Sequence, residues 1–447
     1  MLLNLFRTEK NMISDSLIFN PPISSPLHPQ LNLPLLKAFL GEKGYKARIV
    51  DSNIDFFHEF LGEDIPRLDI ETCYENPLSI LDYYNDLEDR LATASKRYAG
   101  LNVGLRSLSM RHSRISLDEV LLAITDIEGN PFISFFDRLI KTKLQDEKPK
   151  IVGIAITFQD QIIPGFTLAN IIRNTWSDAI IVMGGQIITR CWETIVDHPE
   201  LPLYADYLAL WDGEIPFLQV HEREMKGVDA ELTNLIDLRN GKRNANRLDA
   251  VLPSPQLPKG DFSDIDFSKY LFPEFLVPMQ TTRGCYAKCA FCAIPFGSNK
   301  YRVRDAKMVA DEIEEIQEHT LREFGHKATL FKFMEDTSSP SMLLSLSEEI
   351  VKRGLDVKWE TFARLEKAFA SKEVMDQLFA GGCRKIHWGL ETNDPYILGD
   401  MNKKTDISYT DPILRYAGEA GILNFCFVLV GFPGETDEMR TKLREYI

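Results

Sequence analysis

Three cysteines lie close together in the sequence, at Cys285, Cys289 and Cys292. Their spacing is C-x3-C-x2-C, which places three thiolates on one loop. Soft thiolate sulfur suits iron–sulfur clusters, and three thiolates can bind three irons of a 4Fe–4S cube. The fourth iron then lacks a protein ligand and is open to a chelating molecule. Zinc, the alternative, usually takes four ligands from paired C-x2-C arms, and no second Cys or His pair lies nearby.

The cysteine loop directly follows the first of a series of predicted strands that alternate with predicted helices. The strands are Val277–Thr282, Ala328–Met334, Val357–Phe362, Lys385–Leu390 and Asn424–Val430. The helices are Ala306–Phe324, Met342–Arg353, Lys372–Ala380, Pro412–Ala420 and Glu435–Tyr446. Five βα units in a row predict a barrel or partial barrel, whose active site lies at the carboxyl ends of its strands. Because the chain ends inside the fifth helix, we expect either an unusually short barrel or a truncated chain.

The cysteine motif has an aromatic residue, Phe291, directly before its third cysteine, and it follows the first strand of the series. In this it resembles the radical S-adenosylmethionine (SAM) superfamily. The resemblance implies that the methionine amino and carboxylate groups of SAM chelate the open iron. One electron, delivered by a donor such as flavodoxin or ferredoxin, then splits the sulfonium to methionine and a 5′-deoxyadenosyl radical. The resemblance also implies that Phe291 packs near the adenine.

Further segments resemble the later strands of the same superfamily, where polar groups contact SAM. The implied contacts are Asp336, Glu360, Arg364 and Glu391. Arg364 is suited to the carboxylate of SAM, and residues 431–436 closely match the glycine–proline turn after the fifth strand. Each segment also has a simpler interpretation: Asp336 could cap a helix, Arg364 and Glu391 could form ion pairs of the barrel, and residues 431–436 could be only a turn.

The N-terminal part also alternates strands and helices. Its predicted strands are Ser16–Phe19, Ala47–Val50, Ile151–Phe158, Ala179–Met183 and Tyr207–Leu210, and its predicted helices are Leu31–Leu40 and Ile163–Thr175. Short apolar strands of this kind predict a parallel sheet with helices on both faces. Such sheets bind ligands in the crevice beyond the carboxyl ends of their strands. Between about residues 54 and 148 aromatic and charged residues recur at helical spacing, which predicts a helical insertion.

A doubly wound domain before such a barrel is similar to the cobalamin-binding subgroup of the superfamily. The residues that the resemblance implies as cobalamin contacts all lie at or just beyond the carboxyl ends of predicted strands: Asn20, Pro21, Thr157, Phe158, Gln159, Gln161, Gly184, Gly185, Gln186, Gly213 and Glu214. The glycines would let the backbone approach the corrin closely, and Phe158, Gln159 and Gln161 would sit over its lower face. The Asp-x-His-x-x-Gly signature of other cobalamin proteins is absent. The alternatives are another ligand, or a domain that has lost its ligand.

The predicted fold class is therefore α/β. A Rossmann-like, doubly wound cobalamin-binding domain at residues 1–237, with its helical insertion, precedes a linker at 238–275. A partial (β/α)6 barrel of the radical SAM type, similar to a TIM barrel, follows at 276–447. The linker is rich in Asp, Pro, Asn, Lys and Arg without a sustained period.

The resemblance implies an enzyme that methylates an unactivated carbon, or sometimes phosphorus, of a natural-product or peptide substrate. The alternatives that keep both cofactors are ring contraction and oxidative cyclisation without methyl transfer. A substrate-recruiting module without turnover is a third interpretation, against which the complete set of three cysteines speaks. A transfer-RNA methylthiotransferase is a further alternative. It would need extra cluster cysteines in the N-terminal domain, where only Cys73 and Cys191 occur. It would also need a basic RNA-binding appendage, which the sequence does not show.

Composition indicates which partners and which cellular compartment to expect. The formal charge is −15, from 66 acidic and 51 basic residues, and this balance argues against a nucleic-acid partner. No stretch approaches the roughly 18–20 apolar residues that a membrane span needs, and the first 16 residues lack the features of a signal peptide. Seven cysteines, an odd number with three in one loop, do not suit a disulfide framework. We therefore expect a cytoplasmic protein.

Overall fold

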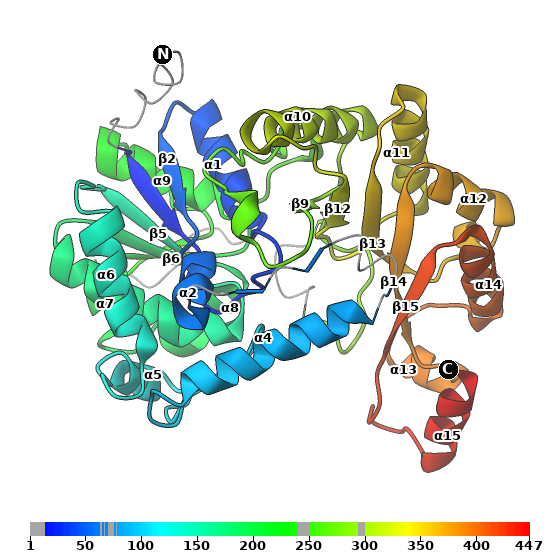
Figure 1. The fold of residues 1–447 in the computed structure, drawn as a ribbon, viewed down its shortest axis with the longest axis horizontal. Coiled ribbons are helices and arrows are strands. Elements are labelled where there is room, and N and C mark those ends of the chain that lie inside the picture. Colours follow the sequence, from blue (N-terminus) through cyan, green and yellow to red (C-terminus); the bar gives the residue numbers. More distant parts are fainter. Residues whose placement is uncertain are drawn as a thin grey trace. The chain divides into compact units, whose positions relative to one another are not determined.

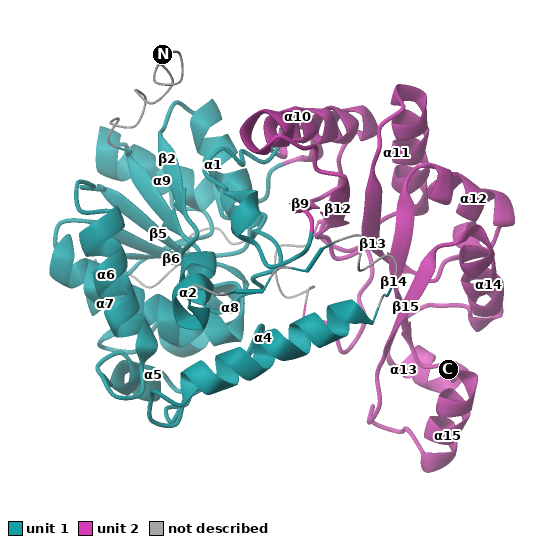
Figure 2. Cartoon of the chain, in the orientation of Figure 1, with its two compact units in different colours: residues 1–252, 258–273 teal, residues 253–257, 274–447 magenta. Residues whose placement is uncertain are grey.

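The computed structural model describes residues 14–62, 65, 66, 68, 69, 76, 78–239, 250–293 and 300–447 (Figure 1). The chain divides into two compact units, shown in Figure 2. Unit 1 comprises Met1–Leu252 and Pro258–Pro273, and unit 2 comprises Pro253–Leu257 and Glu274–Ile447. Among the helices of the described residues, none is both long and apolar enough to cross a membrane.

Unit 1 is built on a six-stranded sheet in the order β2-β1-β5-β6-β7-β8. The strands are β1 (Ser16–Phe19), β2 (Ala47–Val50), β5 (Ile151–Ala155), β6 (Ile180–Gly184), β7 (Tyr207–Ala209) and β8 (Leu235–Asp237). The first five are parallel, and β8 pairs antiparallel with β7. The chain leaves β1 for β2 on one side and later returns to β5 on the other. The doubly wound prediction is confirmed, and the switch in direction lies between β1 and β5, where such sheets bind ligands.

Helices cover both faces of this sheet (Figure 1). They are α1 (Asn32–Glu42), α7 (Ile162–Thr175), α8 (Gln186–Ile195) and α9 (Glu214–Lys226). Helix α1 packs against α9, and α7 packs against α6 (Pro131–Lys143) of the insertion. Gly153 in β5 makes room for α9, because a Cβ atom there would lie 2.9 Å from Phe217. The central strands β1 and β5 are buried along their whole length, as expected of a parallel sheet covered on both faces.

The segment between β2 and β5 is the predicted helical insertion. Its elements are α2 (Ser52–Leu61), α4 (Ser79–Ser95), β3 (Asn102–Val103), β4 (Leu108–Ser109), α5 (Leu117–Ala123) and α6 (Pro131–Lys143). The β3–β4 pair was not predicted, because strands of two residues show no alternation. Phe56 of α2 packs against Phe60, Phe132 and Phe135 at ring-centroid distances between 4.9 and 5.3 Å. This aromatic cluster joins α2 to α6.

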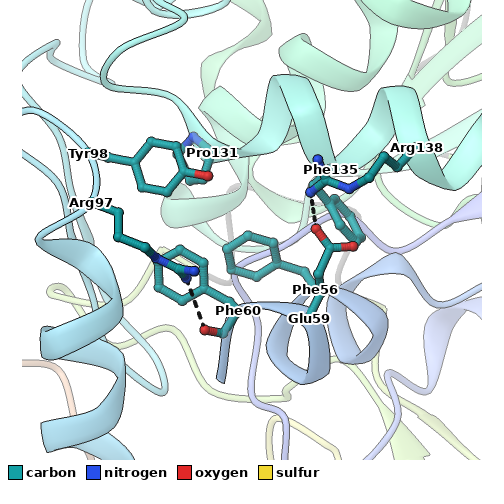
Figure 3. A pocket seen from close by; sticks show the side chains of 8 residues that line it. All are labelled: Phe56, Glu59, Phe60, Arg97, Tyr98, Pro131, Phe135 and Arg138. Carbon is teal, nitrogen blue, oxygen red and sulfur yellow. Dashed lines mark hydrogen bonds and ion pairs between the residues drawn. The ribbon is translucent and has the colours of Figure 1, made fainter. Parts of the chain in front are cut away.

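A cavity of about 400 Å³ opens beside this cluster (Figure 3). Two arginines line it, and both are engaged within the insertion. Arg97 donates to the carbonyl oxygen of Phe60 at 3.2 Å and lies over the ring of that residue, while Arg138 pairs with Glu59. The insertion itself therefore provides partners for both arginines.

Part of the predicted linker, residues 238–275, belongs to the core of unit 1. Residues 258–273 cluster with unit 1, and they include the short helix η4 (Phe267–Lys269). Phe262, Phe267 and Tyr270 are buried there. These aromatic side chains have no helical or strand period, so the sequence pattern did not reveal that they pack. Residues 240–249 of the same predicted linker lie outside the described residues.

Unit 2 contains a parallel sheet in the order β15-β14-β13-β12-β9, so neighbours in the sheet follow one another in the chain. The strands are β9 (Leu276–Met279), β12 (Leu330–Phe333), β13 (Lys358–Arg364), β14 (Cys383–Glu391) and β15 (Leu423–Val428). The helices are α10 (Ala306–Phe324), α11 (Pro340–Arg353), α12 (Lys372–Ala380), α13 (Pro395–Asp400), α14 (Thr410–Ala420) and α15 (Asp437–Tyr446). All the predicted strands and helices are confirmed, with shifts of a few residues at their ends.

Unit 2 differs from the prediction in two details. The predicted (β/α)6 pattern has six strands, whereas the described residues form a sheet of five parallel strands. Helix α13 was not predicted, because its six residues are too few to show a period.

Along β13 the side chains alternate: Trp359, Thr361 and Ala363 are buried, whereas Glu360, Phe362 and Arg364 are half-buried on the other face. The half-buried face carries Glu360 and Arg364, two of the predicted SAM contacts.

Candidate functional site

The cysteine loop begins where β9 ends. The short strand β10 (Thr282–Arg283) pairs with β11 (Arg302–Val303), and this pair forms the base of the loop. Gly284 follows with φ of 81°, a conformation that favours glycine. Within the loop the backbone N–H of Ala287 donates to Cys285 Sγ at 3.4 Å, and that of Cys292 donates to the Cys289 carbonyl at 3.1 Å. The three predicted ligands are thus held on one short loop at the carboxyl end of the first strand.

The chemistry of the donor set fits an iron–sulfur cluster. Cys285, Cys289 and Cys292 are free thiols, each half-buried. Burial raises the pKa of Cys285, and an iron bound to the sulfur would displace its proton. In the part of the chain that the structure describes, no group of three His, Cys, Asp or Glu side chains is arranged to hold a metal ion. A cube takes one thiolate per iron, so its three cysteines need not converge on a single metal atom.

A carboxylate that the sequence did not single out fixes the strand before this loop. Glu335, just after β12, accepts hydrogen bonds from the backbone N–H groups of Thr281 and Thr282 at 2.7 and 2.9 Å. It also accepts from the hydroxyl groups of Thr281, Ser338 and Thr361. Glu335 therefore ties the end of β9 to β12 and β13. The run of Ser and Thr residues at these strand ends is the signal that could have pointed to it.

The predicted contact Asp336 is the next residue, and its environment differs. Asp336 is exposed at the carboxyl end of β12, and its charge raises the pKa of Cys285 beyond the effect of burial. It therefore lies close to the cysteine loop, as the prediction requires. Its contact with SAM stays a prediction.

Three other predicted SAM contacts lie in one network beside the loop. Arg364 Nη1 donates to Cys289 Sγ at 3.5 Å, and Glu391 Oε1 accepts from Lys403 Nζ at 2.8 Å. The ammonium group of Lys403 lies 5.7 Å from the centre of the Phe291 ring. Lys403, at 5% exposure, was not predicted, because it follows α13 and no motif marks it. Glu391 has φ of 62°, and the register between β14 and β15 shifts between Gly389 and Glu391.

Glu360 lies in a separate network on the same face of the sheet. Its carboxylate is 3.2 Å from Lys332 Nζ, is paired with Lys385, and is 3.6 Å from His387 Nε2. Burial alone would raise its pKa, but the His387 interaction and the two lysine charges hold the pKa well below the usual range. Glu360 precedes Arg364 by four residues of strand, roughly 13 Å. The structure thus places Glu360 away from the cysteine loop and in an ion-pair network.

The predicted glycine turn after β15 is present. Gly431 and Gly434 have φ of 84° and 89°, and the Gly431 N–H donates to the Glu435 carboxylate at 2.6 Å. The positive φ values explain the glycines at both positions.

At the carboxyl edge of the unit 1 sheet, two of the predicted cobalamin contacts are buried braces. Gln161 Nε2 donates to Asn20 Oδ1 at 2.9 Å and to the Pro21 carbonyl at 2.6 Å. Gln161 Oε1 accepts from the N–H groups of Thr157 and Phe158, both at 3.0 Å. Gln161 is fully buried and Asn20 is 3% exposed. These side chains join the loop after β1 to the loop after β5, across the switch point.

The remaining predicted cobalamin contacts differ in exposure. Phe158, Gln159 and Gln186 are exposed, whereas Pro21 and Glu214 are buried. Gly184, Gly185 and Gly213 are half-buried. Gly185 has φ of 108°, and a Cβ atom there would lie 2.4 Å from the Ile156 carbonyl oxygen. Packing against the neighbouring strand therefore already requires this glycine, so its presence does not by itself indicate a ligand.

The comparison with protein families gives a match for most of unit 2. Residues 279–447 match the Radical SAM superfamily. The match includes the cysteine loop and the sheet that follows it. It implies a 4Fe–4S cluster and SAM as cofactors, in agreement with the donor set of the cysteine loop.

Curated relatives extend beyond this domain. The chain is 27% identical over 300 residues to an uncharacterized methyltransferase of Pyrococcus horikoshii, covering 65% of this chain and 62% of the relative. It is 25% identical over 311 residues to the anaerobic magnesium-protoporphyrin IX monomethyl ester cyclase of Cereibacter sphaeroides, covering 66% and 48%. It is 32% identical over 189 residues to the bacteriochlorophyllide d C-12(1)-methyltransferase of Chlorobaculum tepidum, covering 40% and 39%. The chain thus spans less than two thirds of the length of each relative.

Two solved structures share the fold across both units. The cobalamin-dependent SAM radical enzyme OxsB superposes with a TM-score of 0.69 at 13% identity, over 97% of this chain and 52% of OxsB. The radical SAM methyltransferase TsrM of Kitasatospora setae superposes with a TM-score of 0.64 at 16% identity, over 97% of this chain and 73% of TsrM. The α/β fold class, a doubly wound unit followed by a radical SAM domain, is confirmed.

Proposed function

We propose that this chain is a cobalamin-dependent radical SAM enzyme that methylates an unactivated carbon, or phosphorus, of a small-molecule or peptide substrate. The observation that carries the proposal is the three-thiolate loop at the carboxyl end of β9, in a radical SAM domain that follows a doubly wound unit. When bound, the cluster and SAM supply an organic radical, and the corrin supplies a methyl group.

In unit 2, Cys285, Cys289 and Cys292 would hold the cluster. Phe291, Arg364 and Glu391 border the same loop and would orient SAM, with Lys403 fixing Glu391. These side chains come from the loop, from β13 and from β14, so three elements position the bound molecule. The protein contributes orientation and the exclusion of water, which bring the reacting atoms together.

In unit 1, the edge between β1 and β5 would hold the corrin. Gln161 and Asn20 keep the two loops of this edge in place through buried hydrogen bonds, while Phe158 and Gln159 remain exposed for contact with a ligand. Phe158 is 43% exposed, an apolar ring that a flat macrocycle would cover. The two named structural neighbours, one a cobalamin-dependent enzyme and one solved with cobalamin, support this part of the proposal.

Two of the curated relatives favour methyl transfer, since they are named as methyltransferases. The second candidate is oxidative cyclisation without methyl transfer, and the observation that favours it is the similarity to a cyclase over 66% of this chain. A methylthiotransferase, a further candidate from the sequence, would need extra cluster cysteines in the N-terminal domain. Cys73 lies outside the described residues, and Cys191 is a half-buried free thiol on α8.

The reaction also needs a one-electron donor, for which we propose flavodoxin or ferredoxin, and a reducing compartment such as the cytoplasm. Purified flavodoxin with its reductase and NADPH should support SAM cleavage. Failure of flavodoxin and of ferredoxin, where dithionite succeeds, would contradict this assignment.

Anaerobic reconstitution of the full chain with iron and sulfide, with and without cobalamin, tests the main proposal. Wild-type protein should take up a cluster and convert SAM to 5′-deoxyadenosine under reducing conditions. Cys289→Ala should lower this rate by about 10³-fold or more, because the cluster loses a ligand. Cys191→Ala is the matched control, a half-buried free cysteine on a helix of unit 1, and it should keep the wild-type rate. Survival of the activity in Cys289→Ala would contradict the cluster assignment.

Corrin uptake is measured in the same samples from the absorbance bands of bound cobalamin. Phe158→Ala should weaken cobalamin binding, whereas Leu203→Ala, at a 59% exposed apolar position of the same unit, should not. S-adenosylhomocysteine formed together with 5′-deoxyadenosine would support methyl transfer. Deoxyadenosine alone with a bound corrin would favour the cyclisation candidate, and wild-type protein that binds no corrin would rule out the cobalamin assignment.

A further inference from the structure

A turn that no sequence motif marks is hydrogen-bonded to the cysteine loop. The turn comprises residues 401–404 and directly follows α13. The Met401 carbonyl accepts from the Ala290 N–H at 2.8 Å, and Asn402 Nδ2 donates to the Lys288 carbonyl at 2.7 Å. Asn402 has φ of 50° and Lys404 has φ of 55°. Two strained residues within four indicate that the surrounding contacts determine the shape of this turn.

The same turn holds the guanidinium group of Arg364. One nitrogen of Arg364 donates to the Lys403 carbonyl, and another donates to Cys289 Sγ at 3.5 Å. The third, Nε, lies 3.6 Å from Glu366 Oε1, which also accepts from the Tyr286 hydroxyl at 2.6 Å. The Arg364 side chain is 11% exposed. The guanidinium is therefore held by the turn and by Glu366, and it faces one of the three cysteine sulfurs.

Hydrogen bonds to the sulfurs of a cluster and nearby positive charge both affect its reduction potential. Reduction adds a negative charge, so a donor and a cation close to a cysteine sulfur stabilise the reduced form. Two other charges near the loop differ from Arg364 in this respect: Lys403 is paired with Glu391, and the negative charge of Asp336 acts on Cys285. Arg364 is a cation in direct contact with a cysteine sulfur of the loop.

We propose that Arg364, positioned by the 401–404 turn, donates a hydrogen bond to the Cys289 thiolate and raises the reduction potential of the cluster. This inference rests on the proposed cluster in unit 2. It differs from the sequence-based interpretation of Arg364 as a partner of the SAM carboxylate, because it requires an effect in the absence of SAM. Asn402 acts as a positioning residue, since its amide holds the turn on the cysteine loop.

The test is a redox titration of the anaerobically reconstituted full chain without SAM, followed by electron paramagnetic resonance. Arg364→Gln should make the midpoint potential more negative, by about tenfold in the one-electron equilibrium, or about 59 mV. Arg364→Lys keeps the positive charge but has one nitrogen in place of three, so it should shift the midpoint potential in the same direction by less. Asn402→Gly keeps the positive φ and loses the amide, so it should lose iron faster to a chelator and show a small negative shift.

Arg384→Gln is the matched control, because Arg384 lies on the neighbouring strand β14, where it donates to the backbone carbonyls of Phe379 and Cys383 and lies over the Phe379 ring. It should leave the midpoint potential unchanged. Equal potentials in wild type, Arg364→Gln and Arg364→Lys, at equal iron and sulfide content, would overturn the inference while leaving the proposed function intact. Wild-type protein that takes up no iron and sulfide would instead overturn the proposed function, and this inference with it.

Discussion

Two half-buried carboxylates, one in each unit, are held by partners of different kinds. In unit 1, Asp51 accepts from Asn20 Nδ2 at 2.9 Å and from the Tyr270 hydroxyl, and both donors are neutral. In unit 2, Glu360 is flanked by the ammonium groups of Lys332 and Lys385. Burial raises the pKa of Asp51, whereas the interactions of Glu360 with His387 and the lysines lower its pKa despite burial.

The difference shows two ways of keeping loops in place at the end of a parallel sheet. The edge of unit 1 surrounds its carboxylate with amide and hydroxyl donors, which fix the geometry of the loops without adding a cation. Unit 2 pairs its carboxylate with cations, which fix geometry and also create an electrostatic field where water screens charges poorly. Neutral donors suit the edge proposed for the macrocycle, and charged side chains suit the unit proposed to hold the cluster and SAM, which carry charges that must be stabilised.

The largest expected effect on stability comes from the brace before the cysteine loop. Glu335→Gln places an amide N–H₂ group against N–H and O–H donors of Thr281, Thr282, Ser338 and Thr361. Loss of at least two charge-assisted hydrogen bonds should lower the free energy of unfolding of unit 2 by about 4 kcal/mol. Urea unfolding followed by the fluorescence of the buried Trp359 and Trp388 measures it.

Glu323→Gln is the control for this variant, since the Glu323 side chain is 49% exposed on α10. Hydrogen exchange of peptides around Thr281 should accelerate in Glu335→Gln and not in Glu323→Gln. Equal unfolding midpoints in the two variants would show that Glu335 is not the brace described above.

A smaller effect, with a defined pH dependence, is expected from Glu360→Gln. The folded-state pKa of Glu360 lies below its ordinary value of 4.5. The interaction therefore stabilises unit 2 above about pH 4.5, and this stabilisation is lost as the pH falls through the folded-state pKa. Near neutral pH the variant should be about 2 kcal/mol less stable than wild type, and the difference should shrink in acid. Urea unfolding across this range measures it, with Glu419→Gln as an exposed control; a constant difference would contradict the assignment.

The smallest effect, with the opposite sign, is expected from Asp51→Asn. The folded-state pKa of Asp51 lies above its ordinary value of 3.8, so its protonated form stabilises unit 1 at low pH. That contribution is lost as the pH rises through the raised pKa. The variant should therefore gain about 1 kcal/mol relative to wild type as the pH rises towards neutrality.

Hydrogen exchange of peptides in unit 1, across the same pH range, reports this gain. Asp118→Asn, at a side chain that is 83% exposed, should follow wild type. Parallel pH profiles for wild type and Asp51→Asn would contradict the raised pKa, and with it the contrast between the two units.

Much of the fold was predictable because its signals are local. The strands of both units are short apolar runs, and several helices end at glycines that adopt positive φ, such as Gly325 and Gly354. The antiparallel strand β8 and the buried segment 258–273 were not predicted. Their residues pack through contacts with distant parts of the chain, such as the hydrogen bond from the Leu271 N–H to the Pro26 carbonyl, and have no period of their own.

The candidate site was predictable to a different degree in each unit. The cysteine loop follows from spacing alone, and the structure brings Phe291, Arg364 and Glu391 to the same region. Glu360 was grouped with them in the sequence, but the structure places it among Lys332, Lys385 and His387. A strand pattern identifies which residues share a face, but it does not show how far along that face each residue finds its partner.

The sequence by itself determined the three thiolates, the order of strands and helices, and the loops that end at the carboxyl edges, because each depends on residues close together in the chain. Only the tertiary structure decided which polar side chains brace and which remain available. Gln161 reaches Asn20 across 141 positions, and Arg364 reaches Cys289 across 75. The direction of a buried hydrogen bond depends on which partner the fold brings within about 3 Å, and one strand's sequence does not contain that information.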